Sequence, residues 1–154
     1  MTKLLLAWHN IEVNPKDRLS NSPLLHATQG GHLEVMKLLL AWHNIKVNSK
    51  DNDGDSLLCY AAQNEHLEVM KLLLAQHNIE VNPKDEYGHS PLSYAAQNGH
   101  LELTKLLACH NIEVNPKDRL NNSPLSYVAQ NGNLEVVLPW SWPMFFEIIE
   151  LQCH

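Results

Sequence analysis

Apolar and polar residues alternate along the chain in a way that predicts pairs of short helices. In residues 51–84, Leu57, Leu58 and Ala61 keep helical spacing and predict a first short helix. A more apolar run over residues 67–74 has the same spacing and predicts a second helix. Neither helix can bury its apolar face alone, so the pattern predicts that helix pairs stack against one another.

Capping and turn residues mark where these helices begin and end. Asp51–Asp55 contains Asp, Asn and Gly, which is typical of turns, and Ser56 then suits a helix N-cap. Elsewhere a proline follows the equivalent serine, at the first helical position where its fixed φ is tolerated. These prolines are Pro23, Pro91 and Pro124. Residues 79–82 alternate like an extended segment, so the predicted unit is turn, helix, helix and extended arm.

This unit repeats along the chain. The string Val-Asn-(Pro/Ser)-Lys-Asp ends at Asp17, Asp51, Asp85 and Asp118, with spacings of 34, 34 and 33 residues. A fixed period of this length predicts an all-α solenoid of stacked units. The expected divisions are a partial unit at 1–16, full units at 17–50, 51–84 and 85–117, an incomplete unit at 118–138 and a divergent tail at 139–154.

The unit resembles the ankyrin repeat. Residues Asp85–Leu107 follow the family pattern Asp-x-x-Gly-x-Thr-Pro-Leu-His-x-Ala-Ala-x-x-Gly-His, with Ser90 in place of Thr and Ser93 in place of the first His. The resemblance covers residues 1–138. It implies an ankyrin-repeat solenoid of helix-turn-helix units with short extended arms, a non-catalytic role in protein binding, and a concave groove formed by turn tips and first helices.

The chain departs from the family pattern at two sets of positions. The family's first His is replaced in every unit, and the next position holds His26, Tyr60, Tyr94 or Tyr127, which we expect to form a polar ladder inside the stack. In addition, Glu65 occupies a turn position where the other units have glycine. If that turn needs positive φ, the non-glycine residue costs about 1 kcal/mol.

The tail is the most apolar stretch of the chain and leaves three interpretations open. Pro139 should end the preceding helix by Leu138, because proline disrupts a helix interior. Residues 140–151 could cap the stack, dock a partner or a second copy of the chain, or be a truncation or reading-frame accident. Asn10–Leu24 and Asn111–Leu125 differ only at Ser20/Asn121, which favours recent duplication within a longer array.

Composition narrows the class of partner and the compartment. The formal net charge is −6, with 11 basic and 17 acidic residues, which argues against duplex nucleic acid as a partner. No stretch is long enough to span a membrane. The three cysteines form no disulfide framework or zinc motif, so we expect reduced thiols and an intracellular, cytoplasmic protein.

The residues that could carry chemistry favour structural roles. The ten histidines are spread over successive units, too far apart for shared zinc coordination, and we expect no metal or cofactor. Cys109 and His110 are neighbours in sequence, which does not bring thiol and imidazole together, so no catalytic residue is assigned. The asparagine that ends each arm (Asn14, Asn48, Asn82 and Asn115) is interpreted as bonding its own turn.

The resemblance places the partner-binding residues at the turn tips. Tyr87 is the expected hot spot, followed by Arg18 and Arg119, because aromatic and arginine side chains dominate protein interfaces. The full candidate set is Arg18, Leu19, Asn21, Asn52, Asp53, Asp55, Glu86, Tyr87, His89, Arg119, Leu120 and Asn122. The expected function is therefore a protein-binding scaffold module with an unidentified partner. The alternative is a structural spacer within a larger ankyrin-repeat protein whose specificity lies elsewhere.

Overall fold

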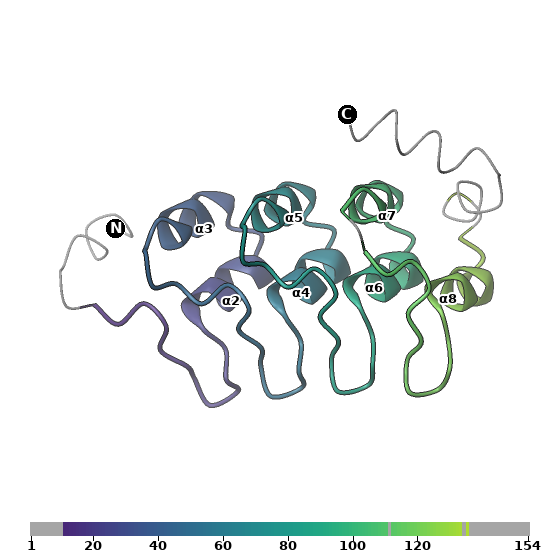
Figure 1. The fold of residues 1–154 in the computed structure, drawn as a ribbon, viewed down its shortest axis with the longest axis horizontal. Coiled ribbons are helices and arrows are strands. Elements are labelled where there is room, and N and C mark those ends of the chain that lie inside the picture. The colour runs from purple at the N-terminus through teal and green to yellow at the C-terminus, as the bar shows by residue number, and fades with distance from the viewer. Residues whose placement is uncertain (1–10, 111, 134, 136–154) are drawn as a thin grey trace.

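The computed structural model describes residues 11–110, 112–133 and 135, and these form seven helices and no strand. In chain order the helices are α2 (Pro23–Gln29), α3 (Leu33–Leu40), α4 (Leu57–Gln63), α5 (Leu67–Leu74), α6 (Pro91–Asn98), α7 (Leu101–Ala108) and α8 (Pro124–Asn131). Figure 1 shows α2, α4, α6 and α8 side by side in one row and α3, α5 and α7 in a second row. The turns project from the first row, away from the second. The predicted all-α repeat solenoid is confirmed, whereas the predictions about residues 139–154 lie outside the described residues.

Serine caps begin every first-row helix. Ser22, Ser56, Ser90 and Ser123 each accept a hydrogen bond from the backbone N–H three residues later. In α6 and α8 a second serine completes a capping box, because Ser93 and Ser126 accept a hydrogen bond from the N-cap backbone N–H. These two serines occupy the position of the family's first histidine, so the departure from the family pattern strengthens the helix start.

The core lies between the two rows and between successive units. Leu24, Leu58 and Leu92 occupy equivalent positions in α2, α4 and α6, and all three are fully buried. Met36 in α3 and Met70 in α5 are fully buried at equivalent positions of the second row. One continuous apolar cluster runs from Leu24 to Ile112, which is the packing expected when each unit covers its neighbour.

The arms are joined by asparagine side chains rather than by a strand ladder. Asn14 Nδ2 donates to the Asn44 carbonyl at 2.9 Å, while its Oδ1 accepts from the Lys46 N–H at 2.9 Å. Asn48 repeats this arrangement with the third arm, at 2.7 Å and 2.9 Å. The interpretation of this asparagine as bonding its own turn is therefore wrong for Asn14, Asn48 and Asn82, each of which holds the arm of the next unit.

The turn at Glu65 has the backbone conformation that the sequence pattern suggested. Glu65 has φ 58°, and the equivalent Gly31, Gly99 and Gly132 have φ of 66°, 75° and 69°. The position therefore requires the left-handed region in every unit, and the second unit alone occupies it with a residue that carries a Cβ.

The cysteines differ in state. Cys59 is a free thiol buried at the start of α4, whereas Cys109 is disulfide-bonded. The expectation of reduced thiols therefore holds for Cys59 and not for Cys109. None of the described helices has the length and apolarity needed to cross a membrane.

Candidate protein-binding surface at the turn tips

The four turns end in tips that are tied to one another through the backbone. We define the tip row as residues 18–20, 52–54, 86–88 and 119–121. The Asn52 N–H donates to the Leu19 carbonyl at 3.1 Å, the Glu86 N–H to Asp53 at 3.0 Å and the Arg119 N–H to Tyr87 at 2.9 Å. Side chains of the tip row are therefore presented from a continuous, hydrogen-bonded edge (Figure 1).

An aspartate shapes each turn from within. Asp85 Oδ1 accepts hydrogen bonds from the N–H groups of Tyr87 and His89, both at 2.8 Å. Asp17, Asp51 and Asp118 make the same two bonds in the other turns. Two backbone bonds to one carboxylate oxygen fix the direction in which the tip leaves the stack.

Eight of the twelve candidate residues are exposed in the tip row. They are Arg18, Leu19, Asn52, Asp53, Glu86, Tyr87, Arg119 and Leu120. Three of them are large apolar side chains: Leu19 is 64% exposed, Tyr87 59% and Leu120 82%. Tyr87 and Leu120 belong to adjacent tips, so the third and fourth units offer two apolar side chains on neighbouring turns.

The remaining four candidates occupy equivalent positions and point into the turns. Asn21 is buried, while Asp55, His89 and Asn122 are half-buried. Asn21 and Asn122 donate through Nδ2 to the aspartate of their own turn, at 3.4 Å and 3.3 Å. Their contacts favour a role in holding the tips in place rather than in direct contact with a partner.

The polar ladder expected from the sequence is present, and its acceptors are the turn aspartates. Tyr60 Oη donates to Asp51 Oδ2 at 2.5 Å, and Tyr94 Oη donates to Asp85 Oδ2 at 2.7 Å. Tyr127 donates to Asp118 in the same way, and His26 Nε2 contacts Asp17 Oδ2 at 2.9 Å in the first unit. Each pair lies nine residues apart and joins the first-row helix to its turn.

The hydrogen bonds of the ladder act in opposite directions on the pKa of the tyrosine and the pKa of the aspartate that it joins. Burial, followed by the hydrogen bond to Asp118, raises the pKa of Tyr127 to about 12. Although burial acts to raise the pKa of Asp85, hydrogen bonds from Tyr94 and His89 hold it below its ordinary value. The pKa of Asp118 is lowered against burial by Tyr127 and Asn122. At neutral pH these aspartates are therefore ionised and act as hydrogen-bond acceptors.

Asp55 behaves differently because its carboxylate lies among others. Burial, and then the charges of Asp51, Asp85 and Asp53, raise the pKa of Asp55 to about 6, against the hydrogen bond from Tyr94 that lowers it. Its position in the second turn therefore favours a protonated side chain under mildly acidic conditions.

His89 connects the third and fourth units. Its Nδ1 lies 3.0 Å from Asp85 Oδ2, and its Nε2 lies 3.1 Å from the Tyr127 hydroxyl and 3.7 Å from Asp118 Oδ2. Its ring centroid is 6.1 Å from that of Tyr87. The sequence predicted His89 as a contact residue, but no sequence signal gave its bridging position between two turns.

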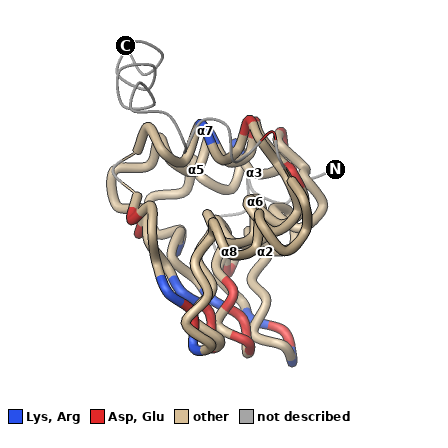
Figure 2. Tube along the Cα trace, turned by 90° about the vertical axis from the view of Figure 1, so that its right-hand side faces the viewer, with Lys and Arg blue, Asp and Glu red and all other residues tan. Residues whose placement is uncertain are grey.

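Charge gathers in the turns more than on the helices. Figure 2 shows acidic and basic residues together at the tips. Arg18 and Arg119 lie in the outer two turns, whereas Asp53 and Glu86 lie in the middle two. The opposite signs across the tip row give a partner several charges to match.

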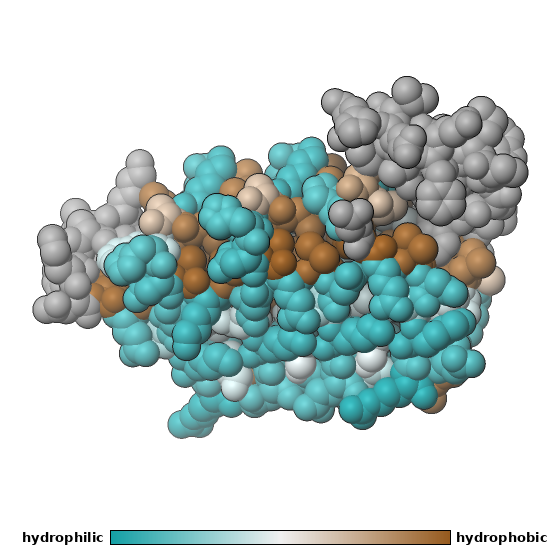
Figure 3. Space-filling model, in the orientation of Figure 1, coloured by the Kyte–Doolittle hydropathy of each residue, from teal (hydrophilic) through white to brown (hydrophobic). Residues whose placement is uncertain are grey.

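Two other exposed apolar residues lie in the last unit. Val114 is 43% exposed and Leu125 44%, although their equivalents Val13, Val47 and Leu24 are buried. Their exposure therefore reflects position at the end of the described stack. Figure 3 shows an apolar band along the upper part of the stack and a mostly hydrophilic lower part, which includes the turns.

The residues considered for chemistry make structural contacts. His66 and His100 each contact the carbonyl at the end of the preceding first-row helix, Gln29 at 3.0 Å and Gln63 at 3.2 Å. His110 Nδ1 contacts the Leu106 carbonyl at 2.7 Å. Burial raises the pKa of Cys59 to about 12, so this thiol stays protonated at neutral pH. Within the described ranges, no three His, Cys, Asp or Glu residues are placed to hold a metal.

Comparison with known proteins identifies the repeat. Residues 1–85 and 78–138 match a family model described as ankyrin repeats (3 copies). The comparison with individual curated proteins found no match.

Proposed function

The chain belongs to the ankyrin-repeat family, and on that premise we propose that it binds a protein partner through the tip row and the adjoining first-row helices. Ankyrin repeats generally mediate protein–protein interaction. The choice of the tip row as the binding surface rests on two features: its side chains are exposed, and backbone hydrogen bonds join successive tips.

The observation that carries the proposal is that two exposed apolar side chains lie on adjacent tips whose backbones are joined by a hydrogen bond. Tyr87 and Leu120 lie on adjacent tips, and the Arg119 N–H donates to the Tyr87 carbonyl. A tyrosine loses little conformational entropy for the area that it buries, and a fixed backbone reduces the cost of association further. This corner of the tip row therefore has the properties of an interface hot spot.

The charged tips would supply orientation rather than most of the affinity. Arg18 and Arg119 can form paired hydrogen bonds with carboxylates of a partner, while Asp53 and Glu86 attract basic groups between them. Asn21, Asp55, His89 and Asn122 support these tips from beneath through their contacts within the turns.

Affinity capture with matched variants tests this function. Partners retained by the wild-type chain should be lost or strongly reduced with Tyr87→Ala combined with Leu120→Ala, and reduced with Arg18→Ala or Arg119→Ala. Glu34→Ala is the control, because Glu34 is exposed on α3 in the second row. Equal capture by the tip variants and the control would reject the tip row as the binding surface.

The alternative function, a rigid spacer, makes the opposite prediction. Hydrogen bonds between successive arms and successive tips run the length of the described stack, which suits a spacer as well as a binding module. A spacer would keep all its associations when the tips are changed. The same comparison therefore separates the two functions, while self-association through residues 140–151 lies outside the described residues.

A further inference from the structure

The arm of the second unit differs in chemistry from its three siblings. The arms at 11–16, 79–84 and 112–117 all read Ile-Glu-Val-Asn-Pro-Lys, whereas residues 45–50 read Ile-Lys-Val-Asn-Ser-Lys. Only two positions change. Lys46 replaces a glutamate, which reverses the charge, and Ser49 replaces a proline, which adds a hydroxyl and a backbone N–H.

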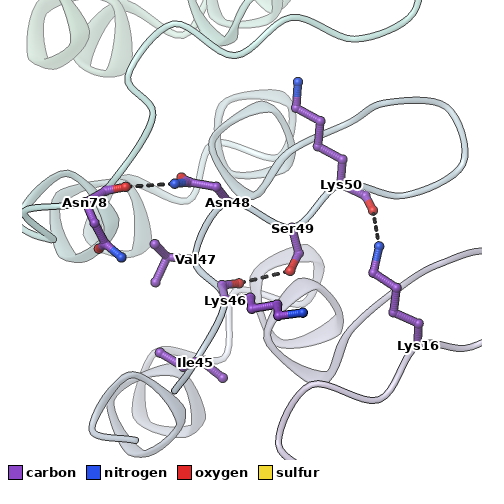
Figure 4. A pocket seen from close by; sticks show the side chains of 8 residues that line it. All are labelled: Lys16, Ile45, Lys46, Val47, Asn48, Ser49, Lys50 and Asn78. Atoms are coloured by element: carbon purple, nitrogen blue, oxygen red, sulfur yellow. Dashed lines mark hydrogen bonds between the residues drawn. The ribbon is translucent and has the colours of Figure 1, made fainter. Parts of the chain in front are cut away.

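Both changed residues line one pocket. The pocket measures about 560 Å³ and opens between the first and second arms, where Lys16, Lys50 and Asn48 also line it. Figure 4 shows the Lys46 side chain extending toward the arm that carries Lys16, while the Lys50 ammonium points away. The two residues that make the second arm unlike its siblings therefore meet at a single cavity.

The charge reversal removes an ion pair that the repeat geometry otherwise permits. Lys84 Nζ lies 3.6 Å from Glu113 Oε2 in the next arm. Lys50 and Glu80 are the equivalent residues one boundary earlier, and Lys16 and Lys46 are the equivalent residues two boundaries earlier, where both are cationic. Two ammonium groups replace a cation and an anion, so this boundary has an unmatched positive charge in a chain with net charge −6.

Among the described residues, neither Lys16 nor Lys46 forms an ion pair. Lys16 Nζ uses one proton in a hydrogen bond to the Lys50 carbonyl at 3.0 Å, which leaves two further donors. Among the described residues Lys46 forms no ion pair, although Glu12 and Glu80 occupy the equivalent position in the two flanking arms. Residues 1–10 contain no Asp or Glu and add another lysine, Lys3.

Ser49 adds one available donor, its backbone N–H, to the same wall. Its hydroxyl donates to the Lys46 carbonyl at 3.0 Å, and its N–H has no acceptor among the described residues. Proline in the other three arms has neither group. Asn48 is already occupied by its bonds to the third arm, so Lys16, Lys46 and Ser49 are the groups left to meet a ligand.

We propose that the pocket between the first and second arms binds a phosphate group, held by Lys16 and Lys46 with Ser49 as an additional donor. A dianionic phosphate matches the two lysine charges that line one pocket, whereas one carboxylate matches a single charge. Lysine is a point charge that suits phosphate, and it lacks the planar fork with which arginine selects carboxylates. The site lies on the arms, so the proposal does not depend on partner binding at the tip row.

Titration of the full chain with inorganic phosphate, followed by amide NMR shifts, tests the site. We expect saturable shifts at Lys46 and Ser49 that weaken as NaCl is added. Lys46→Glu, which restores the residue of the sibling arms, should weaken binding at least about tenfold, because it replaces attraction with repulsion. Lys117→Glu makes the same change in net charge in the last unit and should leave binding unchanged.

A gain of function provides a second and independent readout. Lys50 donates to the Lys84 carbonyl at 3.0 Å, as Lys16 does to the Lys50 carbonyl, and Glu80 occupies the position equivalent to Lys46 in the third arm. Glu80→Lys should therefore create a second phosphate site at the next boundary, with shifts in residues 79–84. A phosphoserine peptide and an aspartate peptide of the same sequence test whether the phosphate can belong to a phosphorylated protein. The phosphoserine peptide should compete with inorganic phosphate, and the aspartate peptide should not.

Three results would overturn the proposal. The first is a linear, non-saturating response that Lys46→Glu leaves unchanged, which would indicate nonspecific charge screening. The second is a stronger response to the aspartate peptide than to phosphate. The third is equal weakening by Lys46→Glu and Lys117→Glu, which would assign the effect to net charge alone.

Discussion

The Tyr94 hydroxyl lies 3.1 Å from Asp55 Oδ1, so the helix of one unit contacts the turn of the unit before it. The same hydroxyl lies 2.7 Å from Asp85 Oδ2. A tyrosine has one hydroxyl proton and cannot donate to both carboxylates. Protonation of Asp55 resolves this conflict, because Asp55 then donates to Tyr94 while Tyr94 donates to Asp85.

Asp55→Asn should stabilise the protein at neutral pH. Because the pKa of Asp55 is about 6 when folded and 3.8 in the reference state, the stabilising contribution is full below pH 3.8 and is lost as pH rises through 6. Asparagine cannot ionise, so it should raise the free energy of unfolding at pH 7 by on the order of 1–2 kcal/mol, allowing for solvent screening. Urea denaturation at pH 4, 5, 6 and 7 measures the difference, which should vanish near pH 4.

A second variant that neutralises one carboxylate separates the pH dependence caused by Asp55 from the pH dependence caused by the histidines. Glu86→Gln removes one negative charge from the exposed tip of the next unit. This variant is the control for the loss of one negative charge and is measured over the same pH range. A parallel slope for Asp55→Asn and the wild type between pH 4 and 7 would contradict the assignment.

Tyr60→Phe should weaken the second unit. The change removes the hydrogen bond to Asp51 at 2.5 Å, and bonds to charged groups contribute about 1.5–3 kcal/mol. Thermal unfolding should therefore show a lower Tm. Tyr87→Phe is the matched control, since the Tyr87 hydroxyl has no hydrogen-bond partner among the described residues, and its Tm should be close to that of the wild type.

Glu65→Gly should stabilise the stack by about 1 kcal/mol, because glycine adopts positive φ without steric cost. The lost ion pair between Glu65 and His100 Nδ1, at 3.5 Å with Glu65 66% exposed, offsets little of this gain. Chemical denaturation gives the free energy of unfolding. Gln63→Gly in α4 is the contrast and should destabilise by about 0.5–1 kcal/mol, since that position is helical. A lower stability for Glu65→Gly would show that the turn does not carry this strain.

Local sequence patterns predicted the repeat, the helices and their caps, because these depend on residues within one unit. The period placed every helix pair, and the serines marked the starts of α2, α4, α6 and α8. The glycine positions also identified the strained turn at Glu65. Contacts within about four residues are what such patterns encode.

Contacts between residues farther apart in the sequence, within a unit or between units, were less accessible to prediction. Tyr60 and Tyr94 were predicted as ladder members, but their acceptors Asp51 and Asp85 depend on how each turn folds back over nine residues. His89 was predicted as a tip residue from its place in the repeat, yet the turn directs its side chain inward to Asp85. Similarly, Asn48 meets the next arm rather than its own turn, because the distance between units decides which carbonyl is in reach.

A further prediction concerns the dependence of partner binding on the supporting residues. His89→Ala should weaken binding less than Tyr87→Ala, because His89 supports the tip from beneath while Tyr87 is exposed. His89→Gln, which keeps a side-chain donor, should recover part of the loss. Isothermal titration of each variant with the captured partner provides the affinities. A larger loss for His89→Ala than for Tyr87→Ala would move the binding surface from the tips into the turns.

Site-specific photocrosslinking tests the central claim most directly. A photoreactive phenylalanine derivative placed at Tyr87 should form an adduct with the partner protein, and the same group at Glu34 on α3 should not. Excess unlabelled wild-type chain should suppress the adduct, whereas the Tyr87→Ala, Leu120→Ala double variant should fail to do so. Adducts from Glu34 alone, or equal suppression by the wild type and the double variant, would contradict binding through the tip row.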